Sequence, residues 1–212
     1  DEIICETGTF PITLSSVSGA VSVFWNSMGD GSFDNSAAVN PVYTPGPLDI
    51  AAGRVDLKLT ASANPACSDA SDITELIIRK QAIVNAGDDD TVCQNNMIQL
   101  KSASADFYSV INWAHNGLGT ITGASTLTPE YTPEPNESGI LTFTLTATAF
   151  GPCVTVSDQR TLTVNEKAVA IAGSVATICE TGTHQLTDAA VSGNTGVLWS
   201  TGGDGSFDNS AT

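Results

Sequence analysis

A cysteine and a tryptophan recur together three times along the chain, each time 20 residues apart. The pairs are Cys5 and Trp25, Cys93 and Trp113, and Cys179 and Trp199. The cysteines of successive pairs are 88 and then 86 residues apart, and the decapeptide GDGSFDNSAA at 29–38 returns as GDGSFDNSAT at 203–212. A fixed period of this length indicates tandem copies of one domain, each long enough to bury its own core.

The period predicts two full domains and part of a third. We place the first at residues 1–79 with its N-terminal strand clipped, the second at 80–165 and the truncated third at 166–212, with linkers at 79–87 and 165–173. The third copy stops less than halfway through the period. We therefore expect the sequence to be a window from a longer tandem array.

Alternation of apolar and polar residues marks the clearest strands. The stretch 55–61 (VDLKLTA) aligns with 141–147 (LTFTLTA), and both have the period of two that is typical of half-buried strands. Further strands are predicted at 12–16, 21–26, 42–44, 73–78, 98–101, 110–114, 130–132 and 160–164. Clusters of Gly, Pro, Asn and Asp separate them, so we predict an all-β chain of tandem antiparallel β-sandwiches. The only helical signal is a turn at 48–52.

Five cysteines fall at positions locked to the repeat, and no CxxC or Cys/His metal pattern is present. We predict the disulfides Cys5–Cys67 and Cys93–Cys153 within the domains, which leaves Cys179 for a partner outside the sequence. Each bond would close a long loop and stabilise its domain by about 4 kcal/mol. This indicates an oxidising, extracellular setting. The alternative is a cytosolic protein with buried free thiols.

The chain carries 23 acidic and 7 basic residues, for a net charge of −16. Such a surface repels nucleic acids and anionic membranes, and it favours divalent cations. The candidate calcium ligands are a triplet at the first domain junction and a trio in the first repeated decapeptide: Asp88, Asp89, Asp90, Asp30, Asp34 and Asn35. Solvated acidic turns are the favoured alternative, because a calcium cage needs more oxygen ligands than one triplet supplies.

Four segments carry a resemblance to a known family. They are 25–33 (WNSMGDGSF), 40–45 (NPVYTP), 49–53 (DIAAG) and 57–61 (LKLTA). Together they resemble the PKD-like, immunoglobulin-like repeats of very large surface proteins of gliding, type IX-secreting bacteria. The resemblance spans essentially the whole chain and implies a secreted, multidomain adhesin or surface filament.

The aromatic residues divide into core and surface candidates. Trp25, Trp113 and Trp199 lie within apolar strands, so we predict core packing rather than sugar-stacking platforms. Aromatic residues outside core positions are few, and they are Phe107, Tyr108 and Phe150.

No catalytic arrangement recurs with the repeat. His115 and His184 occupy non-matching repeat positions, and no phosphate-binding or zinc-protease motif is present. We expect a protein that is not an enzyme and has no cofactor, with calcium as the alternative.

The leading hypothesis is a structural repeat of an extracellular surface filament or adhesin stalk. Stacked domains joined by short linkers favour reach and stiffness. The expected partners are neighbouring repeats of the chain and other filament subunits that add a strand, with no nucleic acid and no membrane insertion. The alternative is a polysaccharide-binding module that acts through loops at one pole of the sandwich.

Overall fold

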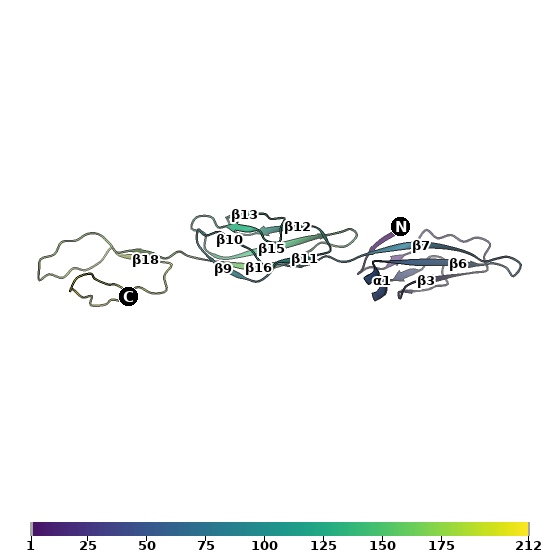
Figure 1. Cartoon of the computed structure of the whole chain (residues 1–212), viewed down its shortest axis with the longest axis horizontal. Helices are drawn as coiled ribbons and strands as arrows, with labels where there is room; N and C mark the ends of the chain where they lie inside the picture. Colours follow the sequence, from purple (N-terminus) through teal and green to yellow (C-terminus); the bar gives the residue numbers. More distant parts are fainter. Residues whose placement is uncertain (1, 212) are drawn as a thin grey trace.

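A computed structural model of the chain describes residues 2–211. Three bodies follow one another end to end along one axis, and the chain runs through them in sequence order (Figure 1). Strands make up almost all of the regular structure. Within residues 2–211, no helix has the length and apolar content needed to cross a membrane.

The first domain is a sandwich of two sheets. One sheet has the order β1-β7-β6-β3 and the other the order β2-β5-β4. The strands are β1 (Glu2–Cys5), β2 (Phe10–Pro11), β3 (Ser22–Ser27), β4 (Ser32–Phe33), β5 (Val42–Thr44), β6 (Arg54–Ser62) and β7 (Ala70–Arg79). The helix α1 (Pro47–Ala52) connects β5 to β6. All pairs are antiparallel except β1, which runs parallel to β7.

The second domain repeats this plan. Its larger sheet has the order β12-β15-β16-β9, and its smaller sheets have the orders β10-β14-β13 and β11-β8. The strands are β8 (Ile83–Asn85), β9 (Asp90–Cys93), β10 (Ile98–Gln99), β11 (Ser104–Asp106), β12 (Tyr108–His115), β13 (Thr120–Thr122), β14 (Glu130–Thr132), β15 (Gly139–Ala149) and β16 (Val156–Asn165). The strand β9 lies parallel to β16, as β1 does to β7. The predicted all-β immunoglobulin-like sandwich is therefore confirmed.

Alternation along the central strands produces two separate cores. Leu57 and its neighbours two residues away on β6 point inward, and the matching face of β15 buries Phe143 and Leu145 completely. The first core also holds Trp25 and Tyr43, and the second holds their equivalents Trp113 and Tyr131. Burying each large apolar side chain contributes about 1.5–3 kcal/mol. Each domain therefore has a core of its own.

The last body does not form a sandwich. Its two strands, β17 (Val169–Ile171) and β18 (Ala190–Ser192), pair with each other and are exposed along their whole length. The Trp199 ring lies tilted against Phe207, with the ring centroids 5.7 Å apart, but is only half-buried. The prediction of Trp199 as a core residue is wrong for the described residues, because 166–211 form only β17 and β18 and lack the strands that cover the equivalent tryptophans in the two full domains.

The strand predictions differ from the structure where the pattern is short. The strand expected at 12–16 is wrong: no strand forms there, the short β2 (Phe10–Pro11) ends just before it, and Leu14 is exposed. The cysteine strands β1 and β9 were not predicted, since four residues are too few to show a period. The helical turn expected at 48–52 is present as α1.

Candidate functional site

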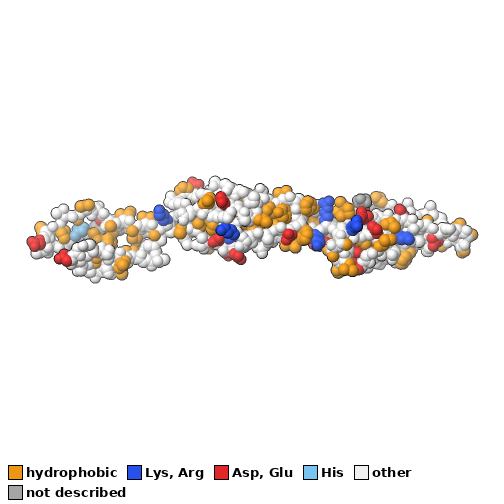
Figure 2. All heavy atoms as spheres, in the orientation of Figure 1, with side chains coloured by type: hydrophobic (Ala, Val, Ile, Leu, Met, Phe, Trp, Pro, Cys, Tyr) orange, Lys and Arg blue, Asp and Glu red, His pale blue; other side chains and the backbone are white. Residues whose placement is uncertain are grey.

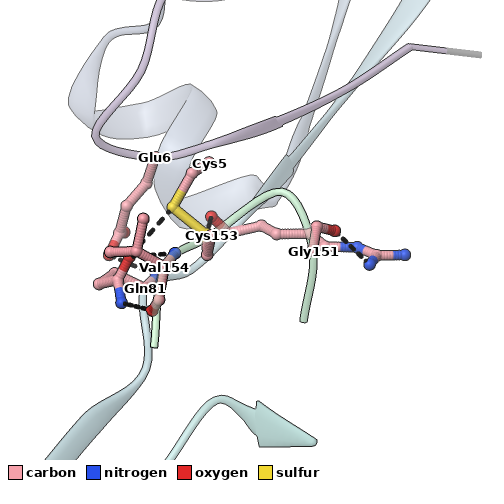
Figure 3. Close-up of a disulfide and its surroundings, with 7 residues drawn as sticks. Cys5, Glu6, Gln81, Gly151, Cys153 and Val154 are labelled. Atoms are coloured by element: carbon pink, nitrogen blue, oxygen red, sulfur yellow. Dashed lines mark hydrogen bonds between the residues drawn. A yellow bond between two sulfur atoms is a disulfide. The ribbon is translucent and has the colours of Figure 1, made fainter. Parts of the chain in front are cut away.

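The joint between the first two domains is closed by a disulfide that links Cys5 to Cys153, with their Cα atoms 4.9 Å apart (Figure 3). The predicted bonds Cys5–Cys67 and Cys93–Cys153 are therefore wrong. Cys67, Cys93 and Cys179 are unpaired and exposed.

The strand β7 explains why Cys5 cannot reach Cys67. Cys5 pairs in register with Arg79 at the end of β7, whereas Cys67 lies in the hairpin before the start of that strand. Ten residues of strand span about 33 Å, and the two Cα atoms of a disulfide are at most about 7 Å apart. The two cysteines of one domain therefore occupy opposite poles, and the Cys5 pole meets the hairpin of the next domain.

Gln81 stabilises the same joint, because it forms hydrogen bonds to both domains. Its backbone N–H donates to Glu6 Oε1 of the first domain at 2.9 Å. Its side-chain Nε2 donates to the Val154 carbonyl at 2.6 Å, and its Oε1 accepts from the Val154 N–H at 3.3 Å (Figure 3). Arg79 Nη1 adds a bond to the Gly151 carbonyl at 2.6 Å. The 150–155 hairpin is thus held by polar contacts as well as by the disulfide.

Two exposed aromatic rings at the joint lie beneath cations. Lys80 Nζ is 5.0 Å from the centroid of the Phe107 ring, and the Arg79 guanidinium carbon is 5.9 Å from that of Phe150. These rings and the half-buried Tyr108 are the aromatic residues that the sequence placed outside the core. Basic side chains gather near this joint in the space-filling view, while acidic ones are scattered (Figure 2). The rings therefore make cation–π contacts across the linker.

The linker itself is short. Residues 80–82 connect β7 to β8, and Ala82 is buried in the second core. So short a connection leaves little rotational freedom when a disulfide and several hydrogen bonds surround it.

A buried carboxylate organises the turns of the first domain. Asp49 is 2% exposed. Its Oδ2 accepts hydrogen bonds from the Tyr43 hydroxyl at 2.6 Å and from the N–H groups of Gly31 and Gly46 at 3.0 and 3.1 Å. Its Oδ1 accepts from the Asp30 N–H at 3.2 Å. Burial raises the pKa of Tyr43 to about 12, and the hydrogen bond to Asp49 adds to the rise.

The second domain contains the same arrangement with a glutamate. Glu137 accepts from the Tyr131 hydroxyl at 2.8 Å and from the N–H groups of Leu118 and Glu134 at 2.6 and 3.0 Å. Desolvation acts to raise the pKa of Glu137, but these donors outweigh it and hold the pKa below its ordinary value of 4.5. Burial raises the pKa of Tyr131 to about 12.

These contacts explain the glycines of the repeated turn. A side-chain carbon at Gly29 would collide with the Asp49 carboxylate, and one at Gly31 would collide with the Tyr43 hydroxyl. In the second domain, a side chain at Gly117 would likewise strike Tyr131. Glycine is required here for close approach rather than for a positive φ. The signal that could have revealed this arrangement is a Gly-x-Gly turn followed by Tyr and, six residues later, an acid.

Acid is expected to destabilise the second domain through Glu137. The folded pKa is lowered, so the unfolded chain binds the proton more readily and the contribution of Glu137 is complete only above about pH 4.5. That contribution is lost as the pH falls through the folded pKa. Carboxyl-detected NMR should give Glu137 a midpoint below 4.5 in the folded chain and an ordinary one in urea. A midpoint above 4.5 in the folded chain would contradict the arrangement.

The candidate calcium ligands in the repeated turn accept hydrogen bonds from backbone groups, and calcium binding by them stays a prediction. Asp30 Oδ1 accepts from the N–H groups of Leu48 and Asp49 at the start of α1, both at 3.1 Å. Asp34 Oδ1 accepts from the N–H of Val42 at 2.8 Å, and Asn35 accepts from Ala37. Turn formation therefore accounts for these three residues.

The acidic triplet lies at the start of β9. Asp89 Oδ1 accepts from the Thr161 N–H at 2.7 Å, and Asp90 Oδ2 is 3.8 Å from the buried Arg160 guanidinium. Across residues 2–211, no three His, Cys, Asp or Glu side chains are grouped as metal ligands. Calcium binding by Asp88 and its two neighbours stays a prediction.

No protein-family model matches the chain, and no curated protein matches it. Among solved structures it is similar to a three-immunoglobulin-domain titin fragment in an E-to-A mutated variant, at 15% identity and a TM-score of 0.45, over 76% of this chain and 61% of that one. It is also similar to domains EC22–24 of mouse cadherin-23 (9% identity, TM-score 0.41, 81% and 63% coverage). Fibronectin(III)-like modules of Clostridium thermocellum CbhA give 14% identity and a TM-score of 0.32, over 78% of this chain and 90% of that one. These values carry no argument about function.

Proposed function

We propose that this chain is a non-enzymatic structural repeat of an extracellular surface filament or adhesin stalk. The observation that carries the proposal is the joint, where one disulfide, the hydrogen bonds of Gln81 and a linker of three residues hold two independently packed domains end to end. A series of such joints transmits orientation from one domain to the next and so gives reach and stiffness.

The chemistry of the joint supports an extracellular location. Disulfides persist in oxidising compartments and are rare in the cytosol, where thiols are kept reduced. The net charge of −16 keeps an extended array soluble and disfavours contact with anionic surfaces. Cell-surface display in a bacterium follows from the family resemblance and belongs to this proposal.

Neighbouring repeats are the proposed partners of the array. At the described joint, successive repeats contact each other through the disulfide and the hydrogen bonds of Gln81. Other filament subunits are proposed as further partners that add a strand.

Electron microscopy of the native material, without refolding, tests the proposed role. Uniform extended fibres with an axial repeat of one or two domains are the expected result. Compact particles that bind polysaccharides on a glycan array would instead establish the binding-module alternative.

Loss of the joint disulfide is expected to loosen the array without unfolding its domains. The Cys5→Ser variant should show a broader distribution of maximum dimensions in small-angle X-ray scattering, because only the linker and polar contacts then hold the joint. The melting temperatures of the domains should change by no more than about 2 °C, since the bond joins two cores instead of crossing one. The matched control Cys67→Ser should leave the scattering curve unchanged. Identical curves for both variants would contradict the role of the bond.

A further inference from the structure

The two bonded cysteines have repeat-related counterparts that are unpaired. Cys67 corresponds to Cys153, 86 residues later, and Cys93 corresponds to Cys5, 88 residues earlier. Both counterparts are exposed. Each full domain thus has one cysteine at each pole, and at the described joint the two facing cysteines are bonded.

The hairpin that holds Cys67 is built like the one that holds Cys153. The hairpin bonds close at Ala61 with Ala70 in the first domain and at Ala147 with Val156 in the second, so both loops have the same length. The Cys67 N–H donates to the carbonyl three residues earlier at 2.8 Å, and Cys153 does the same at 3.1 Å. Cys67 is therefore presented as the bonded Cys153 is.

The pole that holds Cys93 is built like the pole that holds Cys5. Cys93 pairs in register with Asn165, the last residue of β16. The Gln94 N–H donates to the Asn165 carbonyl at 2.8 Å, and the Lys167 N–H donates to Gln94 Oε1 at 3.1 Å. Glu6 makes the same two contacts beside the bonded Cys5. The pole at Cys93 therefore already has the local structure that surrounds the bonded Cys5.

We infer that Cys67 and Cys93 are the open halves of an interdomain disulfide ladder. Each joint carries one bond, from the strand-end cysteine of one domain to the hairpin cysteine of the next. The partner of Cys67 is a cysteine at the Cys5 position of an adjoining domain of this type, and the partner of Cys93 is a cysteine at the Cys67 position of another. The ladder deepens the proposed structural role and rests on it.

Formation of each bond is a two-electron oxidation. Two thiols lose two protons and two electrons, one S–S bond forms, and a small disulfide such as oxidised glutathione is reduced to two thiols. The exposure of Cys67 and Cys93 leaves both accessible to such an oxidant. Cys5 and Cys153 show that the geometry of the joint permits the product.

The ladder changes how the array responds to tension. The Cys5–Cys153 bond brackets 148 residues, and a bond from Cys93 begins inside that bracket. The segments enclosed by successive disulfides therefore overlap, so every part of the chain between two joints lies within at least one of them. A force on the ends of the array cannot extend an enclosed segment, which corresponds to about 500 Å of fully extended chain.

Disulfide mapping of the native protein tests the ladder directly. The protein is alkylated at once on isolation and digested without reduction. We expect Cys67 and Cys93 in cross-linked peptides whose other half comes from an adjoining domain. Alkylated Cys67 or Cys93, or an intradomain Cys93–Cys153 peptide, would overturn the ladder. Native fibres in which Cys67 and Cys93 are free thiols would overturn the ladder but not the proposed filament. Compact particles in which both cysteines are bonded to an adjoining domain would overturn the filament but not the ladder.

A second test uses the 212-residue chain itself. In the monomer fraction of the Cys153→Ser variant oxidised with glutathione, Cys5 should remain a thiol or a glutathione adduct, because Cys67 of the same chain lies at the other pole. A Cys5–Cys67 bond within one chain would contradict the pole assignment and with it the ladder, whereas a Cys5–Cys67 bond between two chains is the pairing that the ladder predicts. The Cys67→Ser variant serves as the control and should retain the Cys5–Cys153 bond.

Discussion

Replacement of Asp49 by alanine is expected to destabilise the first domain by about 3–5 kcal/mol. The variant removes the acceptor of four donors, which are the Tyr43 hydroxyl and three backbone N–H groups. Each buried donor left without a partner costs about 1–3 kcal/mol, and these costs are not additive within one network. Urea unfolding followed by NMR signals of first-domain residues measures the loss.

The control for this variant is Asp56→Ala. Asp56 lies on β6 in the same domain and carries the same charge, but its side chain is exposed. Its replacement should change the free energy of unfolding by less than about 0.5 kcal/mol. Equal losses in the two variants would mean that net charge, and not the buried contacts of Asp49, sets the stability. Signals of the second domain should be unchanged in both.

Replacement of Trp113 by alanine should destabilise the second domain by a similar amount, about 3–5 kcal/mol. Trp113 is 2% exposed, and its indole N–H donates to the Thr126 carbonyl at 3.0 Å. Truncation leaves a cavity beside Phe143 and Leu145 in the core and removes the hydrogen bond to the Thr126 carbonyl. Thermal unfolding by calorimetry should show the transition of the second domain at a lower temperature.

Trp199 offers a matched comparison, because it occupies the same repeat position in the third copy. It is only half-buried, and its ring lies against that of Phe207. The Trp199→Ala variant should leave the calorimetric transitions of both full domains in place. A fall in transition temperature as large as that expected for Trp113→Ala would contradict the half-buried position of Trp199.

The sequence predicted those parts of the fold that depend on local pattern. The alternation at 55–61 and 141–147 identified β6 and β15 because side chains of a strand alternate between its two faces. The same pattern identified Trp25 and Trp113 as core residues, and both are buried. It failed for Trp199, since burial requires covering strands as well as an inward-facing position.

The buried carboxylates were not predicted, because the alternation that marks strands says nothing of them. Asp49 appeared in the sequence only as part of a family-like segment, and Glu137 as one of many acids. Their burial depends on a turn that brings Tyr43 or Tyr131 against the Gly-x-Gly segment. The acid itself lies 18–20 positions after these glycines, and no periodicity encodes a contact at that separation.

By itself, the sequence determined the repeat, the sandwich and the positions of the cysteines within each repeat. Only the tertiary structure decided which cysteines meet. Cys5 and Cys67 belong to one domain, yet the length of β7 keeps them apart, and end-to-end stacking brings Cys5 to Cys153 instead. Spacing along the chain fixes which domain a residue joins, but bond formation depends on distance in space, and that is set by the pole at which each residue emerges.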